Sequence, residues 1–156
     1  MGLIFRQGTM ADLEQVYRLN STTFAERWSH DGLKRALEDG YALLLCMDEK
    51  LLAGYLLSHD VLDEVHIMQI IVAPACRRQG IAEQLSRMLL AARPGRTVLL
   101  EVRASNAAAQ QLYAKLGFVR SGIRKGYYVS QQDDGIREDA ILMHYRSAVG
   151  STEKTT

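Results

Sequence analysis

The sequence predicts an α/β (α+β) protein built on a mixed central sheet with helices on both faces. Segments with the alternation of strands and segments with the spacing of helices follow one another in the order β-α-α-β-β-β-α-β-α-β-β. A strand-helix-strand succession favours parallel pairing and consecutive strands favour hairpins, so both kinds of pairing are expected. The chain has 156 residues, 47% of them hydrophobic. We therefore expect one domain over residues 1–149 and a flexible tail over 150–156.

Four helices are expected, and capping residues mark three of them. Thr9 and Asp12 have the spacing of a capping box ahead of the first helix. Ser29 is placed to cap the second helix. The third helix follows residue 80, with apolar side chains at helical spacing. The last runs from a cap at Asn106 to a C-terminal cap at Gly117.

Strands are expected where apolar and β-branched residues form short runs between turn signals. Two of these runs flank the polar turn Asp-Glu-Lys and predict a hairpin. The expected strands cover residues 3–8, 41–47, 51–60, 64–72, 97–104, 122–128 and 138–146.

Composition and charge argue against several classes of protein. The formal net charge is +1, so the sequence shows no strongly basic surface for nucleic acid or an anionic membrane. Neither a signal-peptide core nor an apolar run of membrane-spanning length is visible. Cys46, Cys76 and the four histidines lack the spacing of a disulfide framework or a metal site. We expect a soluble, cytoplasmic protein, monomeric or weakly dimeric, that binds no metal, nucleic acid or membrane.

The stretch VAPACRRQGIAEQL joins an expected strand to an expected helix. The first amides of a helix have no internal acceptor, and together with the helix dipole they attract anions. Arg77 and Arg78 add donors and positive charge, while Gly80 allows a tight turn and the close approach of a ligand. The stretch therefore suits a pyrophosphate, although a solvated basic helix start is equally open on these residues alone.

Two common phosphate-binding motifs do not fit this stretch. A P-loop needs Gly-Lys followed by Ser or Thr, which the sequence lacks. A dinucleotide fingerprint needs two further glycines before the helix, and only Ala82 stands at one of those places. What remains is an Arg-x-x-Gly-x-Ala turn from Arg77 to Ala82.

On these residues the chain resembles the GNAT family of N-acetyltransferases. The family's acyl-CoA loop is Arg/Gln-x-x-Gly-x-Gly/Ala, which residues 77–82 match. The segment LEVRASNAAAQQLYAKLGF, together with RKGYY, REDAILM and FAERWS, is similar to the branch that acetylates the N-terminal alanine of a ribosomal protein. The resemblance covers residues 5–145. The chain departs from the branch at Arg27, where Pro is more usual, and at Lys125-Gly126, where Arg-Asn is more usual.

The resemblance implies the GNAT acyl-CoA N-acyltransferase fold, a mixed sheet that is splayed between two central strands, with acetyl-CoA as the cosubstrate and no metal. The splayed strands would be residues 66–72 and 97–104. The amide of Val72 would also polarise the thioester carbonyl. The implied acetyl-CoA contacts are Ile70, Ile71, Val72, Arg77, Arg78, Gln79, Gly80, Ile81, Ala82 and Asn106.

Glu101 is the expected general base. It interrupts an apolar strand, and acidic side chains are seldom buried without a partner or a purpose. From the residues alone, an outward-facing carboxylate paired with Arg103 is equally open. The resemblance assigns Glu101 to the removal of a proton from the substrate amine, and the apolar strand would desolvate its carboxylate.

Other side chains have expected roles by resemblance. Tyr113 would be the general acid for the departing thiolate, or only a hydrogen-bond donor to it, while a core aromatic is the structural alternative. Trp28, Tyr127 and Tyr128 would line the peptide entrance, although aromatic residues at a strand end more often pack in the core.

The resemblance implies transfer of an acetyl group to the N-terminal α-amine of a protein, best matched by the N-terminal alanine of a small-subunit ribosomal protein. A lysine or small-amine acetyltransferase of the same fold is one alternative. A non-catalytic acyl-CoA-binding module is another, which would need neither Glu101 nor Tyr113. An acyl-enzyme on Cys76 is disfavoured because no histidine is placed by the sequence to activate that thiol.

Overall fold

The computed structural model describes residues 2–23, 27–129 and 135–146. It confirms the predicted order of strands and helices. Residues 24–26 and 130–134 and the predicted tail 150–156 lie outside the described residues. The strands are β1 (Leu3–Gln7), β2 (Ala42–Asp48), β3 (Leu51–Val61), β4 (Glu64–Val72), β5 (Thr97–Arg103), β6 (Val119–Tyr128) and β7 (Glu138–Arg146), and the helices are α1 (Leu13–Asn20), α2 (His30–Glu38), α3 (Ile81–Ala92) and α4 (Ala107–Leu116).

The strands form one mixed sheet in the order β1-β2-β3-β4-β5-β7-β6. The β4–β5 pair is parallel, whereas β1–β2, β2–β3, β5–β7 and β6–β7 are antiparallel. The parallel pairing joins Glu64–His66 of β4 to Thr97–Leu99 of β5. The chain divides into two compact units. Unit 1 consists of Met1–Asp60 and Ile67–Leu89, and unit 2 consists of Val61–His66 and Leu90–Thr156. The single domain over residues 1–149 stays a prediction.

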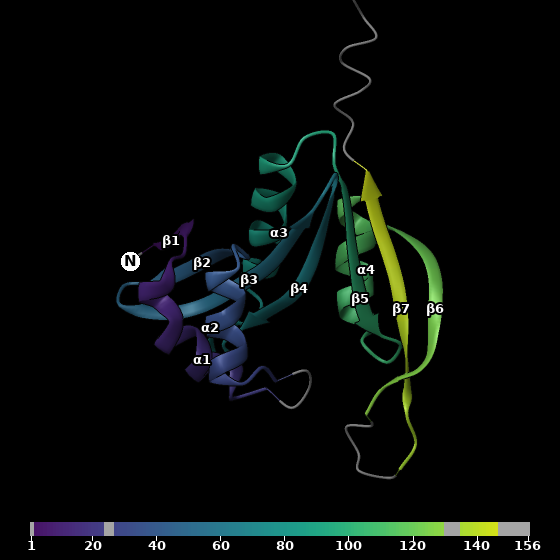
Figure 1. The fold of residues 1–156 in the computed structure, drawn as a ribbon, viewed down its shortest axis with the longest axis horizontal. Helices are drawn as coiled ribbons and strands as arrows, with labels where there is room; N and C mark the ends of the chain where they lie inside the picture. Colours follow the sequence, from purple (N-terminus) through teal and green to yellow (C-terminus); the bar gives the residue numbers. More distant parts are fainter. Residues whose placement is uncertain (1, 24–26, 130–134, 147–156) are drawn as a thin grey trace, which may run out of the picture. The chain divides into compact units, whose positions relative to one another are not determined.

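In unit 1, α1 and α2 cover one face of the sheet (Figure 1). Val16 from α1 and Leu33 from α2 pack in one apolar cluster with Leu45, Tyr55 and Leu57 from the strands. All five side chains are at most 1% exposed. Because burying one such side chain contributes about 1.5–3 kcal/mol, this cluster holds both helices against β2 and β3.

The caps of the first two helices are those the sequence predicts. The Thr9 hydroxyl accepts a hydrogen bond from the Ala11 amide, and the Asp12 carboxylate accepts one from the Thr9 amide, 2.8 Å away. The Arg6 guanidinium also pairs with Asp12 at 2.8 Å and lowers the pKa of that carboxyl. The Ser29 hydroxyl accepts from the Gly32 amide at the start of α2.

The first turn of α3 packs on the other face of β3, where a glycine allows the close approach. A Cβ atom at Gly54 would lie 3.0 Å from both the Ile71 carbonyl oxygen and the Ile81 side chain. Ile81, the first residue of α3, is 2% exposed. The absence of a side chain at Gly54 therefore fixes how closely the start of α3 can lie against the strands.

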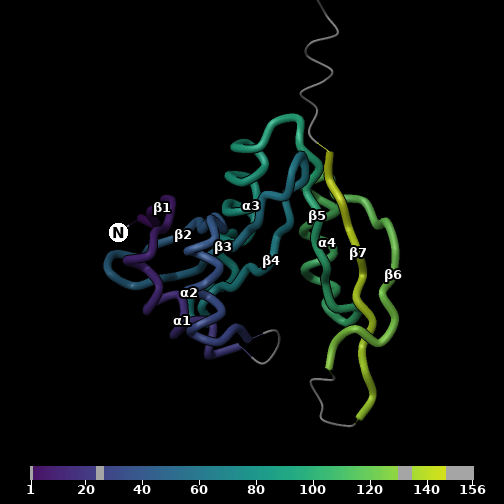
Figure 2. The backbone as a smooth tube through the Cα atoms, viewed as in Figure 1, coloured from purple at the N-terminus to yellow at the C-terminus, as the bar shows by residue number. Residues whose placement is uncertain are grey.

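In unit 2, β5, β7 and β6 form an antiparallel ladder, and Figure 2 shows β6 and β7 running side by side. Helix α4 covers one face of this ladder. Val98, Leu100 and Val102 alternate along β5 and are at most 6% exposed. The Asn106 side chain caps α4 by accepting from the Ala109 amide, and Gly117 ends the helix in the left-handed conformation.

We expect Gly54→Ala to destabilise the protein by about 1–3 kcal/mol, because the added methyl group must displace backbone atoms. Urea unfolding of the wild type and the variant measures this difference. Gly122→Ala is the matched control, since a Cβ atom there meets nothing within 4 Å. Equal stability of the two variants would contradict tight packing at Gly54.

Candidate active site

The predicted phosphate loop lies in unit 1, between β4 and α3. A short turn over Pro74–Cys76 follows β4, and the backbone is then left-handed at Arg78 (φ 66°) and at Gly80 (φ 72°). A left-handed conformation at a residue other than glycine is strained by about 1–3 kcal/mol and is common at functional sites. The sequence predicted the conformational freedom of Gly80 but had no signal for Arg78.

The loop presents positive charge and free amides to solvent. Arg77, Arg78, Gln79 and Gly80 are exposed, and a Cβ atom at Gly80 would meet nothing within 4 Å. The Gln84 amide is the first of α3 to bond within the helix, to the Gly80 carbonyl oxygen. The amides before it have no intrahelical acceptor. This combination fits a phosphate group, as the sequence predicted.

The end of β4, which should bind the pantetheine arm, is held firmly in unit 1. Ile70, Ile71 and Val72 are half-buried. The Ala73 amide, which follows them, donates to the Ala53 carbonyl oxygen of β3 at 2.8 Å. Hydrogen bonding to β3 therefore fixes the strand immediately before the loop.

Glu101 lies in unit 2, on the face of β5 that points away from α4. Its neighbours Leu100 and Val102 face the helix, and strand alternation turns Glu101 to the opposite side. The Glu101 side chain is 31% exposed. The expectation that the apolar strand desolvates this carboxylate is therefore wrong. The buried neighbours Leu100 and Val102 point to the opposite face of β5.

The partner of Glu101 is Arg124, not Arg103. The Arg124 Nε atom lies 3.4 Å from the Glu101 carboxylate, and its guanidinium lies 4.7 Å from the centre of the Tyr127 ring. The alternative pairing of Glu101 with Arg103 is wrong. Arg124 was missed because it is 23 positions from Glu101, and only the β5–β7–β6 register brings the two strands into range.

Arg103 is buried and has partners of its own. It donates to the Glu138 carboxylate at 3.0 Å and to the Val129 carbonyl oxygen, and its guanidinium lies 4.5 Å from the centre of the Tyr128 ring. Glu138 also accepts from the Ser105 amide at 2.6 Å. The pKa of Glu138 is lowered, first by a hydrogen bond from the Ser105 side chain and then by the Ser105 amide and by Arg103, while burial acts in the opposite direction. The pair ties the end of β5 to β7.

The two adjacent tyrosines of β6 have different surroundings. Tyr128 is 9% exposed beneath Arg103, whereas Tyr127 is 41% exposed. Between Arg124 and Tyr128 the register shifts, and side chains replace the ladder. The Gly126 amide donates to Asp139, and Arg137 donates to the carbonyl oxygens of Gly126 and Tyr127. This bulge holds Tyr127 at the surface.

Tyr113 is a buried residue of α4. The side chain is 8% exposed, and its ring lies edge-on to Phe118 with 5.5 Å between the ring centres. Burial raises the pKa of Tyr113 to about 12. The hydroxyl therefore keeps its proton near neutral pH and can donate a hydrogen bond.

Trp28, in unit 1, is fixed through its backbone. Its amide donates to the Asn20 side-chain oxygen at 2.9 Å, and its half-buried ring lies edge-on to Tyr41. Asn20 in turn contacts Tyr55 and Gln69. These three polar residues were not predicted from the sequence, because they are far apart in the chain and no motif surrounds them.

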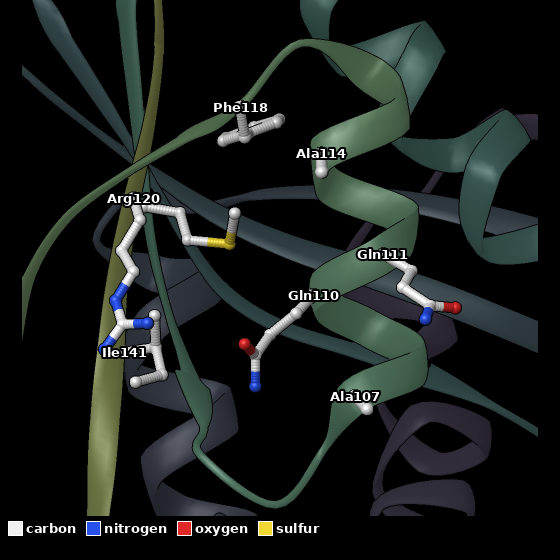
Figure 3. A pocket seen from close by; sticks show the side chains of 8 residues that line it. Ala107, Gln110, Gln111, Ala114, Phe118, Arg120 and Ile141 are labelled. Atoms are coloured by element: carbon white, nitrogen blue, oxygen red, sulfur yellow. The ribbon is translucent and has the colours of Figure 1, made fainter.

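A cavity of about 420 Å³ lies in unit 2 between α4 and the β6–β7 pair (Figure 3). It opens on the α4 side of the sheet, whereas Glu101 faces the other side. None of the predicted site residues lines it. The lining residues are Ala107, Gln110, Gln111, Ala114, Phe118, Arg120, Ile141 and Met143.

Within the described ranges, no group of three or more His, Cys, Asp or Glu side chains is arranged to hold a metal ion. None of the helices in these ranges has both the length and the apolar character that a membrane crossing needs.

Comparison with known proteins places this geometry in a family. The model of the acetyltransferase (GNAT) domain matches residues 9–137. The [ribosomal protein bS18]-alanine N-acetyltransferase of Escherichia coli (strain K12) is 37% identical over 135 residues, 85% of this chain and 89% of that protein. The protein of the same name from Haemophilus influenzae is 32% identical over 143 residues, 90% of this chain and 96% of that protein.

Solved structures agree in fold. The crystal structure of the ribosomal-protein-S18-alanine N-acetyltransferase from Escherichia coli superposes with a TM-score of 0.86 at 33% identity, covering 93% of this chain and 94% of that chain. Arabidopsis thaliana NAA60 in complex with a bisubstrate analogue gives a TM-score of 0.84 at 22% identity, covering 94% and 99%. The second likeness shows the fold alone.

We expect Glu138→Gln to destabilise the protein at neutral pH by about 1–3 kcal/mol, since it weakens two charge-assisted hydrogen bonds. The folded pKa of Glu138 lies below its ordinary value of 4.5. Its stabilising effect is therefore present above that value and is lost as the pH falls through the folded pKa. The stability gap between wild type and variant should shrink below about pH 4.5.

Urea unfolding across this pH range measures the gap. Glu83→Gln, which removes an exposed i,i+4 pair with Arg87, is the control and should change stability little at any pH. A gap for Glu138→Gln that stays constant down to the acid limit would contradict the lowered pKa.

Proposed function

The chain belongs to the GNAT family of acetyltransferases, and from this premise we propose that it transfers the acetyl group of acetyl-CoA to the N-terminal α-amine of a protein. We propose the N-terminal alanine of ribosomal protein bS18 as the substrate. The observation that carries this is the 37% identity, over 85% of the chain, to an enzyme named for that reaction. Because the proposed substrate is a ribosomal protein, we propose that the enzyme acts in the cytoplasm.

Unit 1 would bind acetyl-CoA, which supplies the activated acetyl thioester. The exposed loop from Arg77 to Ala82 would hold the pyrophosphate through its two guanidinium groups and the free amides of α3. The backbone of Ile70–Val72 would bind the pantetheine arm as an added strand does. In unit 2, the Asn106 oxygen caps α4, so its amide nitrogen would be the group that contacts pantetheine.

Glu101 would remove the proton that the amine must lose. An α-amine with a pKa of about 8 is neutral in roughly one molecule in eleven at pH 7, whereas a lysine amine is neutral in about one in a few thousand. A carboxylate on an open sheet face can take this proton directly or through water. The Arg124 Nε atom, 3.4 Å away, pairs with this carboxylate.

Tyr113 would stabilise the departing thiolate as a hydrogen-bond donor. Its pKa of about 12 lies well above the value of about 8.5 for a thiol, so complete proton transfer from Tyr113 is unfavourable. The buried hydroxyl can still share its proton with a developing negative charge. The burial of Tyr113 therefore favours a role as hydrogen-bond donor over a role as general acid.

Aromatic side chains would contact the peptide. Tyr127 is the exposed member of its pair and is held at the surface by the β6–β7 bulge, and Trp28 is half-buried in unit 1. Tyr128 is buried beneath Arg103, so it would act by supporting Tyr127, 4.9 Å away between ring centres.

The decisive assay measures CoA release from acetyl-CoA with a peptide that begins Ala-Arg. The comparison peptide has a blocked N-terminus and a free internal lysine. We expect release with the free terminus only, and a loss of about 10²–10⁴-fold in Glu101→Gln, since general bases contribute that much. Glu38→Gln on the exposed side of α2 is the control variant.

Release with both peptides would instead indicate a lysine or general amine acetyltransferase. Binding of CoA without release from any peptide would indicate the binding module. Full activity of Glu101→Gln would remove Glu101 from the mechanism while leaving the substrate assignment in place.

We expect Tyr113→Phe to lower kcat by about tenfold to a hundredfold, the value of a hydrogen bond to a charged group. Because the pKa of Tyr113 is about 12, its hydroxyl is protonated throughout the neutral range, and the loss should be equal at low and high pH. A kcat–pH profile of both proteins measures this. A loss that grows with pH would show that Tyr113 must give up its proton.

A further inference from the structure

Three buried polar side chains in unit 1 are hydrogen-bonded to one another. Asn20 and Tyr55 are completely buried, and Gln69 is 8% exposed. The Asn20 amide nitrogen lies 3.1 Å from the Tyr55 hydroxyl and 3.0 Å from the Gln69 side-chain oxygen, and the Tyr55 hydroxyl donates to that oxygen at 2.6 Å. The three residues come from the end of α1, from β3 and from β4.

The donors and acceptors leave one arrangement of the Asn20 amide. Its NH₂ group faces two oxygens, so its own oxygen faces the Trp28 amide, which donates to it at 2.9 Å. A flipped amide would set a donor against the Trp28 N–H and an acceptor against the Gln69 oxygen. Asn20 thus links the group to the segment before α2 through the Trp28 amide.

This contact fixes Trp28 to the central sheet over a long separation in sequence. The bond from Trp28 to Asn20 continues through Gln69 into β4. Gln69 directly precedes Ile70–Val72, the stretch assigned to acetyl-CoA. Tyr41 supports the Trp28 ring from the other side, and stacks on His59 at 4.0 Å between ring centres.

Burying three polar side chains in an apolar cluster is unfavourable unless every one is paired. The cluster around them consists of Val16, Leu45, Leu57 and other apolar side chains, which would pack well without the group. An apolar replacement would lack an acceptor for the Trp28 amide. The three polar side chains therefore hold the backbone at Trp28 in a defined position.

We propose that Asn20 is a positioning residue that holds Trp28 in place for the peptide substrate and joins it to β4. The part that concerns the peptide rests on the proposed function. Loss of the contact should weaken peptide binding and leave acetyl-CoA binding unchanged, because the Ala73 amide, directly after Ile70–Val72, keeps its hydrogen bond to the Ala53 carbonyl oxygen of β3.

The test uses the only tryptophan of the chain, Trp28, as its own reporter. In Asn20→Ala we expect acrylamide to quench the Trp28 fluorescence more strongly than in the wild type. Tyr55→Phe is the matched control, because it removes a hydroxyl from the same buried group but keeps the bond from Trp28 to Asn20. Its quenching should equal that of the wild type. Asn20→Leu, which fills a similar volume, replaces the alanine variant if that variant does not fold.

Steady-state kinetics give the second readout. In Asn20→Ala the KM for the Ala-Arg peptide should rise about five- to tenfold, the value of one lost hydrogen bond, with the KM for acetyl-CoA unchanged. In Tyr55→Phe both KM values should stay near those of the wild type. Thermal unfolding of both variants shows that each is folded at the assay temperature.

Two results would overturn the proposal. One is unchanged quenching in the Asn20 variant, and the other is an equal rise of the peptide KM in Tyr55→Phe, which would reduce Asn20 to a contributor to general stability. Quenching is measured without substrate, so it decides the positioning role even if the wild type does not acetylate the peptide. A wild-type protein that does not acetylate the peptide would reject the proposed function but not the positioning role of Asn20.

Discussion

Polar groups that leave water must find partners inside the protein, and this constraint shapes three of the segments near the predicted site. Where the backbone departs from regular pairing, a side chain from a distant element completes its hydrogen bonds. Asp139 and Arg137 do this for the bulge at Gly126, Glu138 does it for the Ser105 amide, and Asn20 does it for the Trp28 amide. The site segments are therefore irregular and yet held in place.

The two proposed catalytic side chains have opposite environments for a simple geometric reason. Glu101 lies on a strand whose other face is covered by α4, so alternation leaves its carboxylate near solvent and near Arg124. Tyr113 projects from that helix into the core, where burial keeps its hydroxyl protonated. One group is suited to accept a proton, and the other is suited to donate a hydrogen bond.

Much of the fold could be predicted because its signals are local. Capping at Thr9, Ser29 and Asn106 depends on residues two or three positions away, and the structure confirms all three. Most strands follow from short runs of apolar residues, but β6 begins at Val119 and not at residue 122 as predicted, because its first residues are mostly polar and exposed and its pairing with β7 defines it. The loop at 77–82 could be predicted because its arginines, its glycine and the helix start lie within six residues. The predicted pairing of Glu101 with Arg103 was wrong. Each of the two side chains instead pairs with a residue on another strand, Glu101 with Arg124 and Arg103 with Glu138.

The sequence by itself determined the order of elements, the caps, the basic loop before α3 and the resemblance to the acetyltransferase family. Only the tertiary structure decided which charges pair: Glu101 with Arg124, Arg103 with Glu138, and Trp28 with Asn20. It also decided that Tyr127 is exposed while Tyr128 is buried. The physical reason is distance along the chain. A cap or a turn is chosen by residues within one helical turn, whereas an ion pair or a buried hydrogen bond is chosen by strands and helices that meet only when the sheet has formed.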